Sequence, residues 1–253
     1  MSVVITGDCH GNFSRFGKAS RNAYKSIFKD TEYVIICGDF GLLWVNDDTF
    51  RYNLNWLSRL PFTILWVAGN HDNYDMIEEY PLEMWHGGKV RHIVRDKIIL
   101  LERGQIFDIN GKKYFTFGGA SSHDISDGIL DPSEFKNEME FRAELIFWKK
   151  TKQFWRIKGL SWWEQELPTD AEIEEAMHNL KTVNNKVDYI ITHCCSSELE
   201  EQMGFYNHDK LTDFFNYVER FVTFDKWYFG HYHRDIEINN KHTLLYIGFD
   251  KII

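Results

Sequence analysis

The sequence predicts an α/β fold with largely parallel strand pairing in its first part. Three observations support this class. Short apolar runs rich in Val, Ile and aromatic residues recur along the chain, several of them end in polar loops that mostly contain glycine, and helix-like stretches lie between them. Strands that alternate with helices are typical of folds built around a parallel sheet.

The apolar runs are predicted to be buried strands because of their length and residue types. The runs that precede chemically loaded loops are Val3–Thr6, Tyr33–Cys37, Thr63–Ala68, Val187–Ile191 and Lys226–Phe229. Further strands are expected at Lys97–Leu101, Ile106–Ile109, Tyr114–Gly118, Asp235–Ile238 and Thr243–Ile247. The pair Asn110-Gly111 between two of these is typical of a tight hairpin turn.

Helices are expected at Phe13–Lys29, Asp48–Leu60, Asp170–Asn184 and Asp209–Phe221. The region 131–167 differs, because it is charged and aromatic and has no strand-like run. Asp131 as a cap, Pro132 at the first helical position and Glu134 at the third indicate a helix start. We expect a helical, aromatic-rich insertion here. A satellite hydrophobic cluster is favoured over a substrate-stacking lid, and an oligomer contact is a third alternative.

Bulk composition narrows the class of protein. The chain has 253 residues without an internal repeat or low-complexity linker, so we expect one domain over residues 1–253. No apolar run is long enough to span a membrane, and no secretory signal is evident, so we expect a cytoplasmic protein. The four cysteines lack Cys-x-x-Cys spacing, which argues for reduced thiols rather than a structural zinc site.

The net charge of −9 disfavours broad electrostatic binding to nucleic acid or to an anionic membrane, but it permits a local positive site.

Potential metal ligands follow the predicted strands. The carboxyl ends of parallel strands meet at one edge of a sheet, so residues far apart in sequence can come together there. These residues are Asp8 and His10, Asp39, Asn70 and His71, His193, and His231 and His233.

This ordered series resembles the calcineurin-like metallophosphoesterase superfamily, with its Asp-x-His, Gly-Asp, Gly-Asn-His-Asp/Glu, His and Gly-His-x-His motifs. All of them occur in order between residues 7 and 233. The resemblance implies a two-sheet αββα sandwich with the insertion around residues 131–167. It also implies a dinuclear metal-dependent phosphoesterase that hydrolyses a phosphomonoester or phosphodiester through a metal-bridging hydroxide.

The resemblance further implies a division of the ligands between two metals. One metal would be held by Asp8, His10, Asp39 and His233, and the other by Asn70, His193 and His231, with Asp39 bridging both. Carboxylate, amide and imidazole donors suit two divalent transition metal ions, namely Mn, Fe or Zn, with Ni and Co as further candidates. Such ions outweigh two carboxylates and would attract a phosphate.

In the family, the position of His71 protonates the leaving oxygen or contacts the phosphate, which suits an imidazole near neutral pH. Asp72 is a catalytic candidate that would either orient His71 or fix the loop. Leu42 replaces the tyrosine ligand of purple acid phosphatases, so an iron–tyrosinate site is not expected. Leu42 and Leu43 also replace the Asp-Arg pair of Ser/Thr phosphoprotein phosphatases, which disfavours that subgroup.

Two further residues are candidates for substrate binding. His123, beside Asp124, either approaches the substrate or belongs to an ordinary loop, and Arg234 contacts either a phosphate or a surface carboxylate. The expected partner is a small phosphate ester, with nucleic acid less favoured and no membrane; the oligomeric state is left open. The alternative functions are a catalytically silent scaffold with the same fold and a nuclease of the same superfamily.

Overall fold

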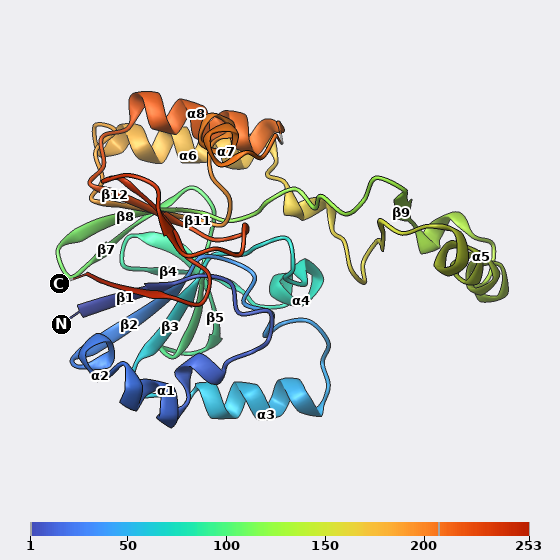
Figure 1. Cartoon of the computed structure of the whole chain (residues 1–253), viewed down its shortest axis with the longest axis horizontal. Helices are drawn as coiled ribbons and strands as arrows, with labels where there is room; N and C mark the ends of the chain where they lie inside the picture. Colours follow the sequence, from blue (N-terminus) through green and yellow to red (C-terminus); the bar gives the residue numbers. More distant parts are fainter. Residues whose placement is uncertain (1, 207, 253) are drawn as a thin grey trace.

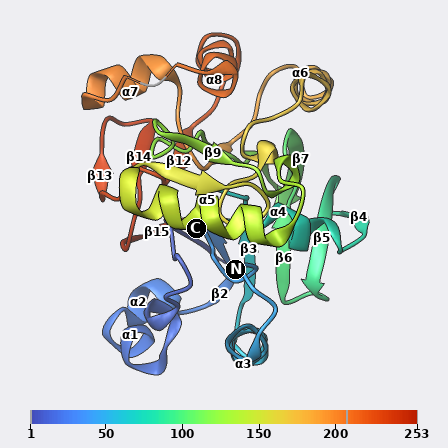
Figure 2. The same cartoon turned by 90° about the vertical axis from the view of Figure 1, so that its right-hand side faces the viewer.

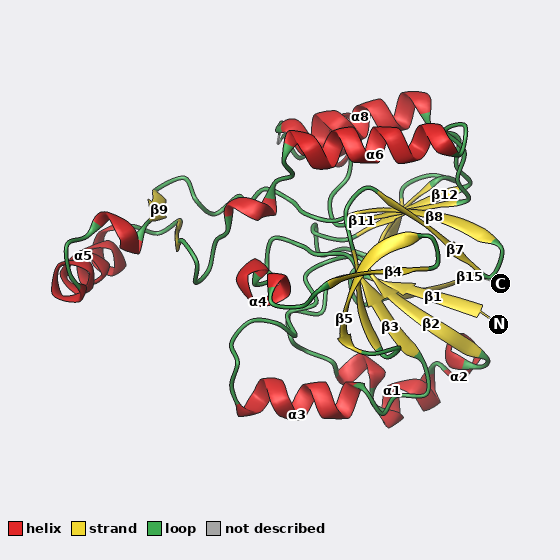
Figure 3. Cartoon of the chain, turned by 180° about the vertical axis from the view of Figure 1, so that it is seen from behind, coloured by secondary structure: helices red, strands yellow, loops and turns green. Residues whose placement is uncertain are grey.

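The first of two stacked mixed sheets contains the amino-terminal strands (Figures 1 and 3). In the computed structural model, which describes residues 2–206 and 208–252, its strand order is β15–β1–β2–β3–β6–β5–β4. Strands β1, β2, β3 and β6 are parallel, whereas β15, β4 and β5 run antiparallel to their neighbours. The bounds are β15 (Phe249–Ile252), β1 (Ser2–Thr6), β2 (Thr31–Ile36), β3 (Thr63–Trp66), β6 (Ile98–Leu101), β5 (Gly88–Val94) and β4 (Leu82–Trp85).

The second sheet has the order β13–β14–β12–β11–β8–β7. Its central strands β14, β12, β11 and β8 are parallel, and an antiparallel strand closes each edge. The bounds are β13 (Ile236–Glu237), β14 (His242–Leu244), β12 (Lys226–Phe229), β11 (Tyr189–Thr192), β8 (Lys112–Phe117) and β7 (Gln105–Ile109).

Helices cover the outer face of each sheet, which confirms the expected αββα sandwich (Figure 1). The first sheet is covered by η1 (Ser14–Phe16), α1 (Lys18–Ala23), α2 (Lys25–Phe28) and α3 (Asp48–Leu57), and the second by α6 (Asp170–Thr182), α7 (Ser197–Met203) and α8 (Lys210–Phe221). The short elements α4 (Tyr74–Glu78) and η3 (Glu164–Glu166) lie in connecting segments. No helix within residues 2–206 and 208–252 is long and apolar enough to cross a lipid bilayer.

Strand β1 shows how the sequence produces these layers. Successive side chains of a strand point to opposite faces of the sheet. Val4 packs in the cluster beneath the helices of the first sheet, whereas Val3 and Ile5 join Phe107 and Tyr228 in the core between the sheets. Each fully buried Val or Ile contributes roughly 1.5–3 kcal/mol. A strand that is apolar on both faces is therefore stabilised by burial on both faces.

All the predicted strands are present within a few residues of their expected bounds, and β7 and β8 form the hairpin expected around Asn110-Gly111. The single helix expected over Phe13–Lys29 is wrong. Gly17 has extended backbone (φ −67°, ψ 162°) and Tyr24 is also non-helical (φ −103°, ψ 42°), so the segment breaks into η1, α1 and α2.

The insertion projects from the body as a separate arm, which we define as residues 128–157 (Figures 1 and 3). It consists of β9 (Gly128–Leu130), η2 (Pro132–Glu134), α5 (Glu138–Thr151) and β10 (Trp155–Ile157). Helix α5 agrees with the expected helical, aromatic-rich insertion, and the parallel pairing of β9 with β10 adds two short strands that the sequence did not indicate. Asp131 caps only the short η2, which ends where Phe135 becomes extended, and Asn137 caps α5.

Candidate metal centre

The first group of potential metal ligands combines residues from the two ends of the chain. Asp8 and His10 follow β1 and His233 follows β12, so the two sheets contribute one loop each. The Nε2 atoms of His10 and His233 are 2.9 Å apart, and the Asp8 carboxylate lies 3.3 Å from His233 and 3.7 Å from His10. All three side chains therefore point to one position.

The second group forms around His193, which follows β11. Its Nδ1 atom lies 2.7 Å from the Cys37 carbonyl oxygen, to which a ring N–H at that position would donate. This contact leaves Nε2 facing the Asn70 Oδ1 atom at 3.1 Å and the Asp39 Oδ1 atom at 3.3 Å. The His231 ring lies beside this group, with its centroid 5.0 Å from that of His193.

The Asp39 carboxylate connects the two groups. Its Oδ1 atom faces His193, and its Oδ2 atom lies 3.8 Å from His10 Nε2. Asp8 also lies near His193, at 4.0 Å from Nδ1, but that nitrogen is already engaged by Cys37. Asp8 belongs to both groups of potential ligands whose atoms lie within 4.8 Å of one another, but Asp39 faces one group with each carboxylate oxygen.

The loop backbone is strained at the positions that carry these side chains. His10, Asp39, His231 and His233 have positive φ angles of 46°, 46°, 70° and 51°. Left-handed backbone costs a residue with a Cβ atom roughly 1–2 kcal/mol. Such strain persists only where the surrounding structure imposes it, and it concentrates at functional sites.

Two glycines are required because the carboxylates pass directly over their backbone. A Cβ atom on Gly230 would lie 2.0 Å from Asp8 Oδ1, and one on Gly69 would lie 2.1 Å from Asp39 Oδ1. The Asp8 carboxylate also accepts hydrogen bonds from the His231 N–H at 3.0 and 3.1 Å, while Asp39 Oδ1 accepts one from the His71 N–H at 2.7 Å. These contacts explain the glycine that opens the Gly-His-x-His and Gly-Asn-His motifs.

The charges of the cluster favour a cation. Asp8 and Asp39 are 0% and 1% exposed, and buried carboxylates need a positive partner. Burial alone would lower the pKa of His193, but the charges of Asp39 and Asp8 and the hydrogen bond to Asp39 raise it to about 9. The pKa of His10 and that of His231 are lowered by burial, which keeps both rings neutral and available as ligands. This donor set fits divalent metal ions.

His71 lies at the edge of the cluster. Its ring centroid is 5.3 Å from that of His10 and 6.4 Å from that of Trp44, and Trp44 in turn packs against Trp163 at 5.5 Å. Burial lowers the pKa of His71, and the nearby charge of Arg156 lowers it further. The ring is therefore close to the metal ligands and neutral at pH 7.

Asp72 is buried and contacts the backbone of two loops. Its Oδ1 accepts a hydrogen bond from the Gly41 N–H at 3.0 Å, and its Oδ2 accepts one from the Gly69 N–H at 2.9 Å. These contacts are those of a residue that fixes the loop, the second of the two roles that the sequence left open. They hold the loops that carry Asp39 and Asn70 in register with each other.

The two candidate substrate-binding residues are placed differently. The His123 ring is 5.9 Å from the His231 ring, so it lies at the cluster. Arg234 is exposed, and its guanidinium lies over the Phe205 ring at 5.6 Å. His123 is the better placed of the two to meet a bound substrate.

Arg156 lies at the rim of the site, and no pattern in the sequence indicated it. It belongs to β10, at the base of the arm, and forms a two-pronged ion pair with Asp124, with Nε 3.0 Å from Oδ1. Asp124 adjoins His123, and the Arg156 charge helps to lower the pKa of His71, so the Arg156–Asp124 pair lies at the rim of the site. The position of Arg156 depends on the pairing of β9 with β10, and the pattern of apolar residues along the chain did not predict that pairing.

Arg15 and Ser122 also support the candidate ligands, and neither was predicted from the sequence. The Arg15 guanidinium donates to Thr6 Oγ1 at 2.9 Å and to the carbonyl oxygens of Gly7, Asp8 and Tyr246, which fixes the loop that carries Asp8. Asn70 Nδ2 donates to Ser122 Oγ at 3.3 Å, so its Oδ1 atom is left for the cluster. Arg15 contacts backbone carbonyls and Ser122 contacts the Asn70 amide, and neither contact leaves a pattern in the sequence.

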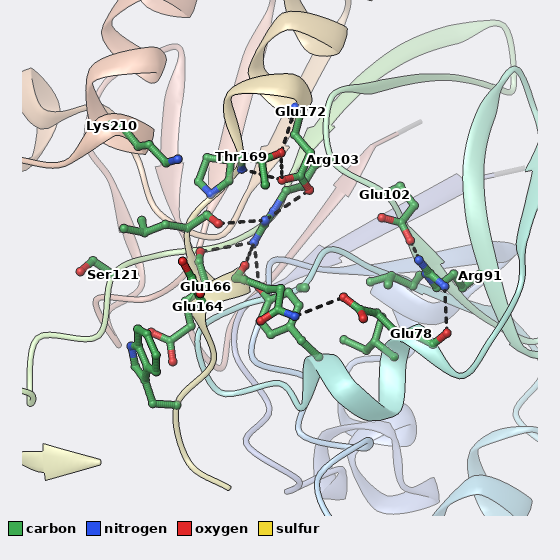
Figure 4. Close-up of a pocket in the computed structure, with 18 of the residues that line it drawn as sticks. Glu78, Arg91, Glu102, Arg103, Ser121, Glu164, Glu166, Thr169, Glu172 and Lys210 are labelled. Atoms are coloured by element: carbon green, nitrogen blue, oxygen red, sulfur yellow. Dashed lines mark hydrogen bonds and ion pairs between the residues drawn. The ribbon is translucent and has the colours of Figure 1, made fainter. Parts of the chain in front are cut away.

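A cavity of about 700 Å³ is lined by residues of α4, η3 and α6 (Figure 4). Residues of the cavity wall include Ala68, Ser121 and Glu166, and Glu166 accepts a hydrogen bond from the Ser122 N–H at 3.2 Å. Its arginines are already paired. Arg91 contacts Glu102 at 2.6 Å, and Arg103 donates to several backbone carbonyls and to Tyr74. The charges of these two arginines are therefore engaged by partners within the protein.

The fold and this cluster define a metallophosphoesterase-type centre. The chain belongs to the calcineurin-like phosphoesterase family, whose family model matches residues 1–235. No curated protein matches the chain significantly. A solved structure with a similar outline is described as "GAP50 the anchor in the inner membrane complex of Plasmodium"; it is 13% identical, with a TM-score of 0.44 over 97% of this chain and 71% of that one.

Proposed function

We propose that this protein is a dinuclear metal-dependent phosphoesterase that hydrolyses a small phosphomonoester or phosphodiester. The observation that carries the proposal is the placement of Asp39, whose two carboxylate oxygens face two different groups of ligands. A carboxylate in this position can hold two cations at once. Bound there, two divalent ions would activate water and neutralise the phosphoryl oxygens.

The residues of the chain would divide the remaining work. Asp8, His10, Asp39 and His233 would hold one ion, and Asn70, His193 and His231 the other, with Asp39 shared. His71 would exchange a proton with the leaving oxygen. Because its pKa is lowered, the ring is neutral in the resting site and must gain a proton before it can deliver one.

Binding of the substrate would rely on the rim of the site. His123 lies beside His231, and the charge of Arg156 contributes to the lowered pKa of His71. An arginine fork suits phosphate oxygens because it can donate two parallel hydrogen bonds. We propose that Arg156 exchanges Asp124 for the substrate phosphate, and that Arg234 plays a lesser part because its charge lies over Phe205.

A cytoplasmic location is also proposed. Cys9, Cys37, Cys194 and Cys195 are free and buried, as expected of thiols that stay reduced.

The experiment is metal analysis combined with turnover. Purified protein should contain about two transition metal ions per chain and cleave p-nitrophenyl phosphate or bis-p-nitrophenyl phosphate, and the ratio of the two rates separates monoesterase from diesterase. Asp39→Asn should lose metal and activity together, while Asp213→Asn, an exposed change on α8, should retain both. A fully active Asp39→Asn protein contradicts the proposal.

The alternatives give different results in the same assay. A silent scaffold would retain metal but turn over none of a broad panel of phosphate esters. A nuclease would prefer single-stranded DNA over the small esters and would bind it less tightly as salt rises.

A further inference from the structure

Helix α5 presents an apolar stripe to solvent at the outer end of the arm. Met139, Ile146 and Phe147 are 79%, 55% and 55% exposed, and Ala143 is also exposed. Their spacing of four, seven and eight residues from Met139 places them on one side of a helix. Large apolar side chains that share one exposed face mark a contact surface more often than a free surface.

The opposite side of α5 is already used within the arm. The Phe141 ring lies 5.7 Å from Phe135, and the Trp148 ring lies 5.6 Å from Trp155. Lys152 Nζ lies over the Trp148 ring at 3.4 Å. The helix is therefore anchored by one face, and the Met139 stripe is directed away from this small cluster.

The charges at the two ends of α5 indicate what covers the stripe. Glu138 and Glu140 lie in the first turn, where Glu138 also pairs with Arg142 of the same helix at 2.6 Å, and Lys149 and Lys150 lie in the last turn. If a second α5 lies antiparallel, with a twofold axis near Ala143, the acidic end of each helix meets the basic end of the other. A parallel pair would instead place like charges together. Such self-complementarity is what a twofold-symmetric contact requires.

We propose that two copies of this chain associate through an antiparallel pair of α5 helices. Ala143 lies at the centre of the contact, where its small side chain allows close approach, and Met139 of each helix packs against Phe147 of the other. The arm carries α5 away from the body, so the helices can meet without the bodies intervening (Figures 1 and 2). One helix pair is a small interface, so we expect association in the micromolar range.

The first test measures the mass of the full-length protein by light scattering and sedimentation over a range of concentrations. The wild type should approach twice its chain mass of 30.2 kDa. Ile146→Glu with Phe147→Glu should remain at the single-chain mass, with unchanged circular dichroism and metal content. Phe221→Glu, which alters an equally exposed residue (59%) on α8, should still dimerise. A monomeric wild type, or a dimeric double variant, overturns the proposal.

The second test determines the orientation of the helices by disulfide cross-linking. A disulfide needs Cα atoms roughly 4.4–6.8 Å apart. Ala143→Cys should cross-link under mild oxidation, because the two copies meet at the axis. Met139→Cys should not, because antiparallel helices separate its two copies by about 12 Å. The native cysteines are buried and do not compete. Equal cross-linking at both positions would indicate a parallel pair and refute the antiparallel arrangement.

The third test examines the charges. Glu138→Lys with Glu140→Lys should weaken association at least tenfold, and the further addition of Lys149→Glu and Lys150→Glu should restore it. A loss that the second pair of changes does not reverse would contradict the charge pairing. If the wild type stays monomeric and the Ile146/Phe147 variant instead loses binding of a single-stranded oligonucleotide, the stripe binds nucleic acid and the dimer is wrong.

Discussion

The Nε2 atoms of His10 and His233 lie 2.9 Å apart, although the two residues are separated by 223 positions in the chain. Two imidazole nitrogens this close, beside the same Asp8 oxygen, are arranged as ligands of one ion. His10→Ala and His233→Ala should therefore each remove the same metal, whereas His231→Ala should remove the other.

The measurement is elemental analysis of each purified variant after loading with a single metal. Each variant should fall from about two ions per chain to about one, and activity should fall at least about 100-fold. The double variant His10→Ala/His233→Ala should still retain about one ion, whereas His231→Ala/His233→Ala should retain none. Loss of both ions from the first double variant would show that the two histidines do not share a site.

Gly230→Ala tests the close approach of the backbone to Asp8. The added Cβ atom would lie 2.0 Å from Asp8 Oδ1, so the carboxylate must move. We expect weaker metal binding and a loss of roughly 1–3 kcal/mol in the free energy of unfolding. Gly17→Ala is the control, because its Cβ would approach only the Ser14 carbonyl oxygen, at 3.1 Å, away from the ligands. Unchanged metal affinity in Gly230→Ala would disprove the steric argument.

Glu166 should make stability depend on pH. Burial raises its pKa from 4.5 to about 8, despite lowering by the hydrogen bonds from Ser122 and Trp163. Between these values the folded protein binds more protons than the unfolded chain, so stability falls as pH rises. The free energy of unfolding of the wild type should fall by roughly 2–5 kcal/mol across this pH range because of Glu166, and Glu166→Gln should abolish that fall.

Denaturant unfolding of the metal-loaded wild type and of Glu166→Gln, at intervals from pH 5 to about pH 9, measures the effect. The difference between the two proteins isolates Glu166 from other titrating groups. Glu166→Gln should be the more stable protein at the alkaline end. Parallel stability curves for the two proteins would refute the shift.

Arg156→Ala tests the contact between the base of the arm and the substrate. If Arg156 binds the phosphate, the change should raise KM about 10- to 100-fold and have a smaller effect on kcat. The inhibition constant for inorganic phosphate should rise in parallel. Lys158→Ala removes the same charge two residues away, where Lys158 pairs with Asp131 at 2.8 Å, and should leave KM unchanged. A similar KM in wild type and Arg156→Ala would exclude the contact.

The positions of most strands along the chain and their buried character could be predicted because they depend on local apolar runs. Strands β4 and β5 were missed since they carry charged residues such as Lys89 and Arg91, as antiparallel strands near a sheet edge can. The break at Gly17 was missed because residue periodicity alone did not show that its backbone is extended. The arm could be recognised as an insertion, but the pairing of β9 with β10 depends on contacts between distant segments.

The positions of the ligands were predictable because each follows a strand and carries a distinctive side chain. The supporting contacts were not predictable. Arg15 acts through backbone carbonyls, and Asp72 through two amides, so neither leaves a motif that reports its partner. The effect of the Arg156 charge on the pKa of His71 depends on the pairing of β9 with β10, which joins segments distant in the chain.

The sharing of one ligand group by Asp8 and His233 has a consequence for biosynthesis. As the chain leaves the ribosome, Asp8 and Asp39 emerge long before the histidines that complete their surroundings. The sheet around β1 and β2 can begin to form early, but two carboxylates placed inside it would lack a positive partner until β11 and β12 arrive. We therefore expect the chain to bind metal only at a late stage of folding, after residue 233 has been made, and a nascent chain stalled earlier should not retain ions.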